Sequence, residues 1–145
     1  MTNRTILLVD DNPGDEVLVR RALSVSKIDS ELIATRDGVE ALDFLLGRGK
    51  HADRDSRKLP AFVLLDLKLP RVDGLEVLRL MRADARARLT PVVMFTSSQE
   101  PRDVMDAFDA GCNSYVCKPV SFEQLVQTLK QIASYWLTLN EPIPQ

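Results

Sequence analysis

Five polar residues stand directly after apolar segments of this sequence, and together they could support phosphoryl transfer. Asp10, Asp11 and Asp66 are carboxylates, and Thr96 and Lys118 add a hydroxyl and an ammonium group. Carboxylates held close together repel one another, and a hard cation such as Mg²⁺ offsets that repulsion well. A carboxylate beside Mg²⁺, with a lysine and a hydroxyl nearby, is equipped to accept a phosphoryl group.

These side chains can meet only if the segments before them are parallel strands. Residues 62–65 are four consecutive apolar residues that run into Asp66 without alternation, which fits a strand buried on both faces. Pro70 cannot donate to a strand ladder, so this strand must end before it. Ligands bind at the carboxyl edge of open α/β sheets. Asp66 is therefore expected at that edge, although a loop-capping role is an open alternative for this residue taken alone.

Four further segments are predicted to be strands, and amphipathic helical patterns separate them. The segments cover residues 5–9, 31–35, 92–95 and 114–117. A last amphipathic helix begins after Ser121, a capping residue, and its apolar positions continue to Leu137. Strands that alternate with helices indicate parallel pairing with right-handed crossovers. The expected fold is α/β, a doubly wound (βα)5 three-layer sandwich with a five-stranded parallel sheet.

Composition limits the function classes further. The chain has 145 residues, of which 45% are apolar and 28% charged, which suits one globular domain over residues 1–145 with a core at 5–137 and a short tail at 138–145. A net charge of −2 does not favour nucleic acid, and neither a membrane span nor a signal peptide is apparent. Cys112 and Cys117 have neither CxxC nor zinc-cluster spacing, so we expect reduced thiols in a cytoplasmic protein.

Four short motifs give the chain a specific resemblance. They are VDD at 9–11, LLDLKLPRVDG at 64–74, FTS at 95–97 and YVCKP at 115–119, each after an apolar strand. In this combination the sequence resembles the response-regulator receiver domains of two-component signalling, over about residues 5–137. The resemblance implies a flavodoxin-like sheet of order 2-1-3-4-5. It also implies a protein that is not an enzyme, apart from self-catalysed phosphorylation and dephosphorylation.

The resemblance assigns a metal site. It implies that Asp66 is the phosphoacceptor and that Mg²⁺ is held by Asp66, by Asp11 directly, by Asp10 mainly through water, and by the backbone carbonyl of Lys68. Taken alone, Asp10 and Asp11 could equally be a helix-capping pair.

The same resemblance assigns a phosphoryl clamp and a switch. It implies that Thr96 and Lys118 bind phosphoryl oxygens, and that Tyr115 is an aromatic switch that turns inward when Thr96 moves. It also implies a cis peptide bond between Lys118 and Pro119, which would aim the lysine. Taken alone, Tyr115 would be an ordinary edge-strand aromatic and Lys118 an ordinary surface residue.

A weaker resemblance concerns partners. A basic segment at 47–58, which could otherwise be a solvated connection, and an extended C-terminal helix resemble the small regulators that serve phytochrome-type histidine kinases. We therefore expect a histidine kinase partner, no direct nucleic acid or membrane contact, no output domain after Leu137, and a downstream target that the sequence does not identify. We also expect a homodimer through the fourth helix, fifth strand and fifth helix. Tyr135, Trp136 and Leu137 are expected to overhang the domain as an apolar patch, unless the tail folds back over them.

Three other functions fit the sequence less well. A haloacid-dehalogenase-like phosphohydrolase needs a second aspartate two residues after the nucleophile, where this sequence has Lys68. A flavodoxin-type binder needs a Ser/Thr/Gly-rich phosphate loop after the first strand, where this sequence has the acidic Asp10 and Asp11. A degenerate receiver acting as an unphosphorylated scaffold is opposed by the complete set of five polar residues.

Overall fold

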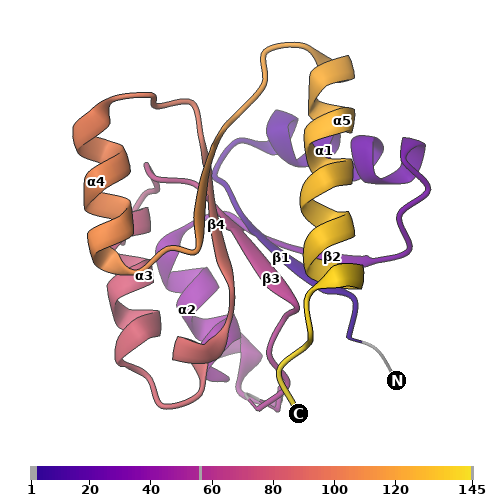
Figure 1. Cartoon of the computed structure of the whole chain (residues 1–145). Coiled ribbons are helices and arrows are strands. Elements are labelled where there is room, and N and C mark those ends of the chain that lie inside the picture. Colours follow the sequence, from indigo (N-terminus) through magenta and orange to yellow (C-terminus); the bar gives the residue numbers. More distant parts are fainter. Residues whose placement is uncertain (1–2, 56, 145) are drawn as a thin grey trace.

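The five expected strands form a single parallel sheet. The computed structural model describes residues 3–55 and 57–144, and its strand order is β2-β1-β3-β4-β5 (Figure 1). The strands are β1 Thr5–Val9, β2 Glu31–Thr35, β3 Phe62–Leu65, β4 Val92–Thr96 and β5 Ser114–Cys117. Both the order and the parallel pairing agree with the fold class expected from the sequence.

Helices cover both faces of this sheet. They are α1 Pro13–Val25, α2 Gly38–Leu46, α3 Gly74–Ala83, α4 Pro101–Ala110 and α5 Phe122–Ser134, with short helical turns η1 Gly49–His51, η2 Ala87–Leu89 and η3 Tyr135–Leu139. Helices α1 and α5 pack side by side on one face, and α2, α3 and α4 lie on the other (Figure 1). The result is the three-layer sandwich expected from the sequence.

The continuous apolar runs are explained by two separate cores. In β3, Val63 and Leu65 pack under α2–α4, whereas Phe62 and Leu64 pack under α1 and α5. All four side chains are buried because β3 lies in the sheet between β1 and β4. A strand buried on both faces has no polar side to display, so alternation disappears.

Each of four helices begins with a side-chain cap directly beyond the carboxyl end of a strand. Asn12, Asp37, Asp73 and Ser121 accept hydrogen bonds from backbone N–H groups in the first turns of α1, α2, α3 and α5. Such caps typically contribute about 0.5–2 kcal/mol each. The loops that lead from β1, β2, β3 and β5 into these helices are therefore fixed at their helix ends, whereas α4 has no side-chain cap.

The basic segment after α2 is folded onto that helix. The guanidinium carbon of Arg54 lies 4.0 Å from the centroid of the Phe44 ring, and Arg54 donates to the carbonyl oxygens of Phe44 and Lys58. Arg48 and Lys50 are exposed, as expected of a solvated connection. Ser56 lies outside the described residues. Stacking and two carbonyl acceptors explain why a charged residue helps to order this connection.

The expected overhang at the C-terminus is wrong for Trp136 and Leu137. The helix changes at η3, where the N–H of Asn140 donates to the carbonyl oxygen of Tyr135 (2.7 Å), and Leu137 is only 6% exposed. Trp136 packs against the core shared by α1 and α5, and Tyr135 is 47% exposed. The tail then folds back along the amino ends of the strands.

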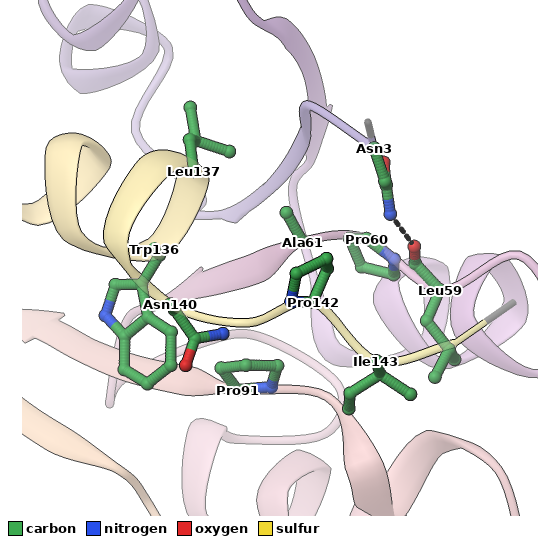
Figure 2. A pocket seen from close by; sticks show the side chains of 10 residues that line it. All are labelled: Asn3, Leu59, Pro60, Ala61, Pro91, Trp136, Leu137, Asn140, Pro142 and Ile143. Carbon is green, nitrogen blue, oxygen red and sulfur yellow. Dashed lines mark hydrogen bonds between the residues drawn. The ribbon is translucent and has the colours of Figure 1, made fainter. Parts of the chain in front are cut away.

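Figure 2 shows the small pocket that this tail encloses. Its walls combine the tail with loop residues that precede β1, β3 and β4, namely Asn3, Leu59, Pro60, Ala61, Pro91, Trp136, Leu137, Asn140, Pro142 and Ile143. Apolar residues from three parts of the chain gather at this helix end, and Leu137 is buried in the core beneath α1 and α5.

Candidate functional site

Two of the predicted carboxylates are placed by the pairing of the central strands. The backbone N–H of Asp66 donates to the carbonyl oxygen of Val9 (2.9 Å), and that of Asp10 donates to the carbonyl oxygen of Thr35 (3.0 Å). These bonds continue the sheet by one residue, so both side chains stand at its carboxyl edge. The side chain of Asp10 is 1% exposed and that of Asp66 is 14% exposed.

Lys118 reaches this edge from β5 and contacts three carboxylates at once. Its Nζ lies 2.7 Å from Asp10 Oδ2, 2.9 Å from Asp66 Oδ2 and 2.9 Å from Asp15 Oδ2. Burial alone would lower the pKa of Lys118, but the hydrogen bonds to Asp10, Asp66 and Asp15 outweigh it and raise the pKa. The ammonium therefore stays charged and partly neutralises the carboxylates around it.

Asp15 is the residue of this cluster that the sequence did not single out. It stands in the first turn of α1, where an acidic side chain is already favoured by the helix dipole. The helix dipole alone accounts for an acidic residue at this position, so the residue type gave no reason to expect its contact with Lys118, which is 103 residues away in the chain. The available signal was its position directly beyond a strand end, on a helix that begins at the same sheet edge.

Three carboxylates form a pocket whose chemistry suits a hard cation. Asp10, Asp11 and Asp66 each offer one oxygen, and these oxygens lie within 4.8 Å of one another. Asp11 is exposed and lines a groove together with Lys68, the residue expected to offer a backbone carbonyl. Burial raises the pKa of Asp10, although hydrogen bonds from Lys118 and Asn12 lower it in part. All-oxygen donors of this kind fit Mg²⁺.

The predicted switch residues lie next to this pocket. Thr96 is the last residue of β4, is 4% exposed, and accepts the backbone N–H of Lys118 at its carbonyl oxygen (2.8 Å). The Tyr115 hydroxyl donates to the carbonyl oxygen of Ser98 (2.9 Å), and its ring packs against the core under α2–α4. Burial raises the pKa of Tyr115, so the hydroxyl remains a donor. Tyr115 is half-buried, and its hydroxyl bonds to the loop before α4.

The expected cis bond between Lys118 and Pro119 is wrong. Of the peptide bonds between residues that the structure describes, none is cis. The trans form is the lower in energy for most X–Pro bonds. Lys118 reaches all three carboxylates from a trans bond, so the cis form is not required to aim it.

The loop after Asp66 is pressed closely against two helix starts. A Cβ on Gly74 would stand 2.1 Å from the carbonyl oxygen of Asp66, and a Cβ on Gly38 would stand 1.9 Å from that of Val72. Neither distance is possible between real atoms. The two glycines therefore allow α2 and α3 to approach the backbone that carries Asp66.

A parallel sheet with an acidic pocket and a lysine at its carboxyl edge defines a phosphoacceptor fold. Residues 6–130 match the family model of the response regulator receiver domain, so this chain belongs to that family. It is the receiver domain of a two-component response regulator. Receiver domains are typically signalling proteins that receive phosphoryl groups from histidine kinases and bind Mg²⁺ or Mn²⁺ at an acidic site.

Three relatives illustrate the likeness. The probable methanogenesis regulatory protein FilR2 of Methanothrix harundinacea is 42% identical over 93% of this chain and 84% of its own length. The response regulator Rcp1 of Synechocystis is 37% identical over 92% of this chain and 89% of its own, and its Mn²⁺-bound crystal structure superposes with a TM-score of 0.87. The phosphorylated cyanobacterial phytochrome response regulator RcpA is 34% identical with a TM-score of 0.89, covering 98% of this chain and 99% of its own.

A membrane span would need a long apolar helix. Among the helices formed by residues 3–55 and 57–144, none is long and apolar enough to cross a bilayer.

Proposed function

We propose that Asp66 accepts a phosphoryl group from a phosphohistidine of a histidine kinase. The observation that carries this proposal is the contact of Lys118 Nζ with Asp66 Oδ2 at 2.9 Å, beside the Asp10 and Asp11 carboxylates. In the transfer, an Asp66 carboxylate oxygen forms a bond to phosphorus while the bond from phosphorus to the histidine nitrogen breaks, and the imidazole leaves with that electron pair. The acceptor is then an acyl phosphate.

Groups of the protein around Asp66 position the carboxylate and neutralise charge before the transfer. Asp66 Oδ1 accepts the backbone N–H of Leu67 (2.7 Å), which fixes the carboxylate plane. Lys118 is placed to bind a phosphoryl oxygen by a short movement from Asp66, and the Thr96 hydroxyl is proposed to bind another. Mg²⁺, when held by Asp10, Asp11, Asp66 and the carbonyl of Lys68, supplies charge neutralisation between the carboxylates and the incoming phosphoryl group. We propose that the protein is not an enzyme, apart from its self-catalysed phosphorylation and dephosphorylation.

The test of the acceptor is labelling by acetyl phosphate or a kinase, read by intact mass and by peptide mapping. Asp66→Asn should abolish labelling, and EDTA should abolish labelling of the wild type. Asp106→Asn is a matched control on α4 and should label normally. Full labelling of Asp66→Asn, or normal labelling in EDTA, would refute the assignment.

We propose a phytochrome-type histidine kinase as the partner. The support is the likeness to RcpA, described as a phytochrome response regulator. The similarity to FilR2, which is described as a methanogenesis regulator, favours a kinase of another sensory class as a second candidate. Rapid transfer from a purified phytochrome-type kinase, but not from other kinases at equal concentration, would support the first. The opposite preference would exclude it.

A cytoplasmic location is proposed together with this partner. Cys112 and Cys117 are free thiols, as expected in a reducing compartment. These two thiols and the family support the proposal, and fractionation of cells that express the tagged protein tests it.

We also propose a homodimer through α4, β5 and α5. Met105 and Phe108 on α4 are 62% and 49% exposed, so this helix presents two large apolar side chains to solvent. In sedimentation equilibrium the Phe108→Glu variant should be more monomeric than the wild type. The Val17→Glu variant, changed at an exposed apolar residue on α1, should dimerise like the wild type. A wild type that stays monomeric at high micromolar concentration, with and without beryllofluoride, would rule the dimer out.

A further inference from the structure

We propose that Asp15 is a positioning residue of the phosphoacceptor site: its carboxylate holds the Lys118 ammonium while a divalent cation occupies Asp10 and Asp66. This inference rests on the proposed function, because it concerns the same metal pocket. It adds to that pocket a residue of α1 that is neither a predicted metal ligand nor a phosphoryl contact.

The three hydrogen bonds of Lys118 carry the argument. A lysine ammonium has three N–H donors, and here Asp10, Asp66 and Asp15 each accept one, at 2.7, 2.9 and 2.9 Å. Asp10 and Asp66 also belong to the group of carboxylates whose oxygens could hold a metal ion, and Asp15 does not. When a cation binds to Asp10 and Asp66, the hydrogen bond between Asp15 and Lys118 is the only one of the three that need not change.

Asp15 is itself held firmly enough to serve as an anchor. Asn12 Oδ1 accepts the backbone N–H groups of Gly14 (2.8 Å) and Asp15 (3.3 Å), which fixes the first turn of α1. The N-terminal end of that helix favours the ionised carboxylate. The side chain of Asp15 is 34% exposed, so its carboxylate can reorganise slightly without leaving the lysine.

The apolar surroundings of the lysine strengthen this contact. A small cavity is lined by Lys118, Asp10 and Asp15 and by apolar side chains, including Val19, Phe95 and Leu125. Charges facing apolar walls attract each other more strongly than charges in open water. Asp15 therefore offers the ammonium a third partner that is not among the carboxylates of the metal pocket.

The consequence is a competition between two cations. Without the Asp15 charge, Lys118 depends entirely on Asp10 and Asp66 and resists the entry of Mg²⁺ more strongly. The affinity for Mg²⁺ should then fall, although Asp15 is not a metal ligand. Loss of negative charge near the pocket would also lower the affinity for Mg²⁺, whether or not Lys118 is present. The loss of the Asp15 contact to Lys118 can lower the affinity only when Lys118 is present.

A double-mutant cycle separates these causes. The Mg²⁺ dissociation constant is measured by calorimetric titration for the wild type, Asp15→Asn, Lys118→Met and the double variant. We expect Asp15→Asn to weaken Mg²⁺ binding roughly 5- to 10-fold in the wild-type background and less than about 2-fold in the Lys118→Met background. Asp109→Asn, at an exposed residue of α4, should leave the affinity unchanged. Circular dichroism establishes that each variant is folded, and Lys118→Ala replaces Lys118→Met if the latter is not.

The outcomes also separate this inference from the proposed function. Equal weakening in both backgrounds would assign the effect to long-range charge and overturn the role of Lys118. An unchanged affinity in Asp15→Asn would overturn the role of Asp15. In both cases a wild type that binds Mg²⁺ and is labelled at Asp66 leaves the proposed function standing, whereas a wild type that does neither refutes the proposed function itself.

Discussion

The carboxyl end of the sheet is lined mainly by charged side chains, and the amino end mainly by apolar ones. At the carboxyl end, Asp10, Asp15 and Asp66 surround a single ammonium, and Asp11 stands beside them. At the amino end, the tail closes over prolines and large apolar side chains (Figure 2). Both ends are reached by the same five strands. The difference teaches that strand order fixes where residues meet, whereas the chemistry at each end is set by the loop residues that flank the strands there.

This contrast has a thermodynamic side. Repulsion among carboxylates at the carboxyl end is offset by Lys118, and a divalent cation can replace part of that compensation. The amino end depends on the burial of apolar surface, which Mg²⁺ does not influence. Stability changes at the two ends should therefore differ in their response to Mg²⁺.

The largest effect is expected for Lys118→Ala without metal. Its removal leaves Asp10 buried beside other carboxylates with no counter-charge, and breaking such a buried pair costs about 3 kcal/mol in the free energy of unfolding. Addition of Mg²⁺ should restore most of this loss, as measured by urea denaturation with and without metal. A loss that Mg²⁺ does not reduce would contradict the contrast between the two ends.

A smaller effect is expected for Trp136→Ala at the amino end. Trp136 is half-buried and packs on the core beneath α5, so its loss should cost about 2 kcal/mol, less than for a fully buried tryptophan. Circular dichroism should follow the unfolding, because Trp136 is the only tryptophan of the chain. The loss should be the same with and without Mg²⁺, and labelling of Asp66 should be unaffected. A Mg²⁺-dependent loss would link the two ends.

Ser121→Ala sharpens the comparison because it lies at the carboxyl end but outside the acidic pocket. Its hydroxyl oxygen accepts the N–H of Gln124 (3.1 Å) and caps α5. Removal of the cap should lower the free energy of unfolding by about 1 kcal/mol. We expect no influence of Mg²⁺ in paired denaturation curves. If Mg²⁺ restored this loss, position along the sheet rather than charge would govern the response.

The smallest effect concerns alkaline pH. Hydrogen bonds to three carboxylates outweigh burial and raise the folded-state pKa of Lys118 above its usual 10.5, so the folded state binds this proton more tightly than the unfolded state. The contribution is fully present below pH 10.5 and is lost as the pH rises above it. The loss should reach about 0.8 kcal/mol near pH 11 in the wild type relative to Lys118→Ala. Parallel alkaline slopes for the two proteins would contradict the pKa shift.

The strands and most of their bounds could be predicted from the sequence, because each contains a run of at least three apolar residues. The expected segments at 5–9, 31–35 and 114–117 coincide with β1, β2 and β5, and β4 is longer by Thr96 alone. The gathering of Asp10, Asp11 and Asp66 could be predicted from parallel pairing, since these residues come directly after strands that are neighbours in the sheet.

The features that the sequence could not predict depend on contacts between distant segments. The contact of Asp15 with Lys118 requires the exact direction of the first turn of α1 relative to β5. The return of the tail brings Ile143 close to Leu59 and Pro91, and no local sequence pattern predicts that approach. The trans bond before Pro119 has no local sequence signal that distinguishes it from the expected cis bond.

The glycine contacts around the loop after Asp66 have a meaning for how such a chain can diverge. Exposed residues of that loop, such as Lys68 and Pro70, can be exchanged for others over successive generations with little steric conflict. Gly38 and Gly74 cannot, because even a single methyl group would enter the backbone of Val72 or Asp66. The exposed rim of this loop can therefore vary while the backbone beneath it cannot. The depth of Asp66 at the sheet edge is set in part by two residues that have no side chain.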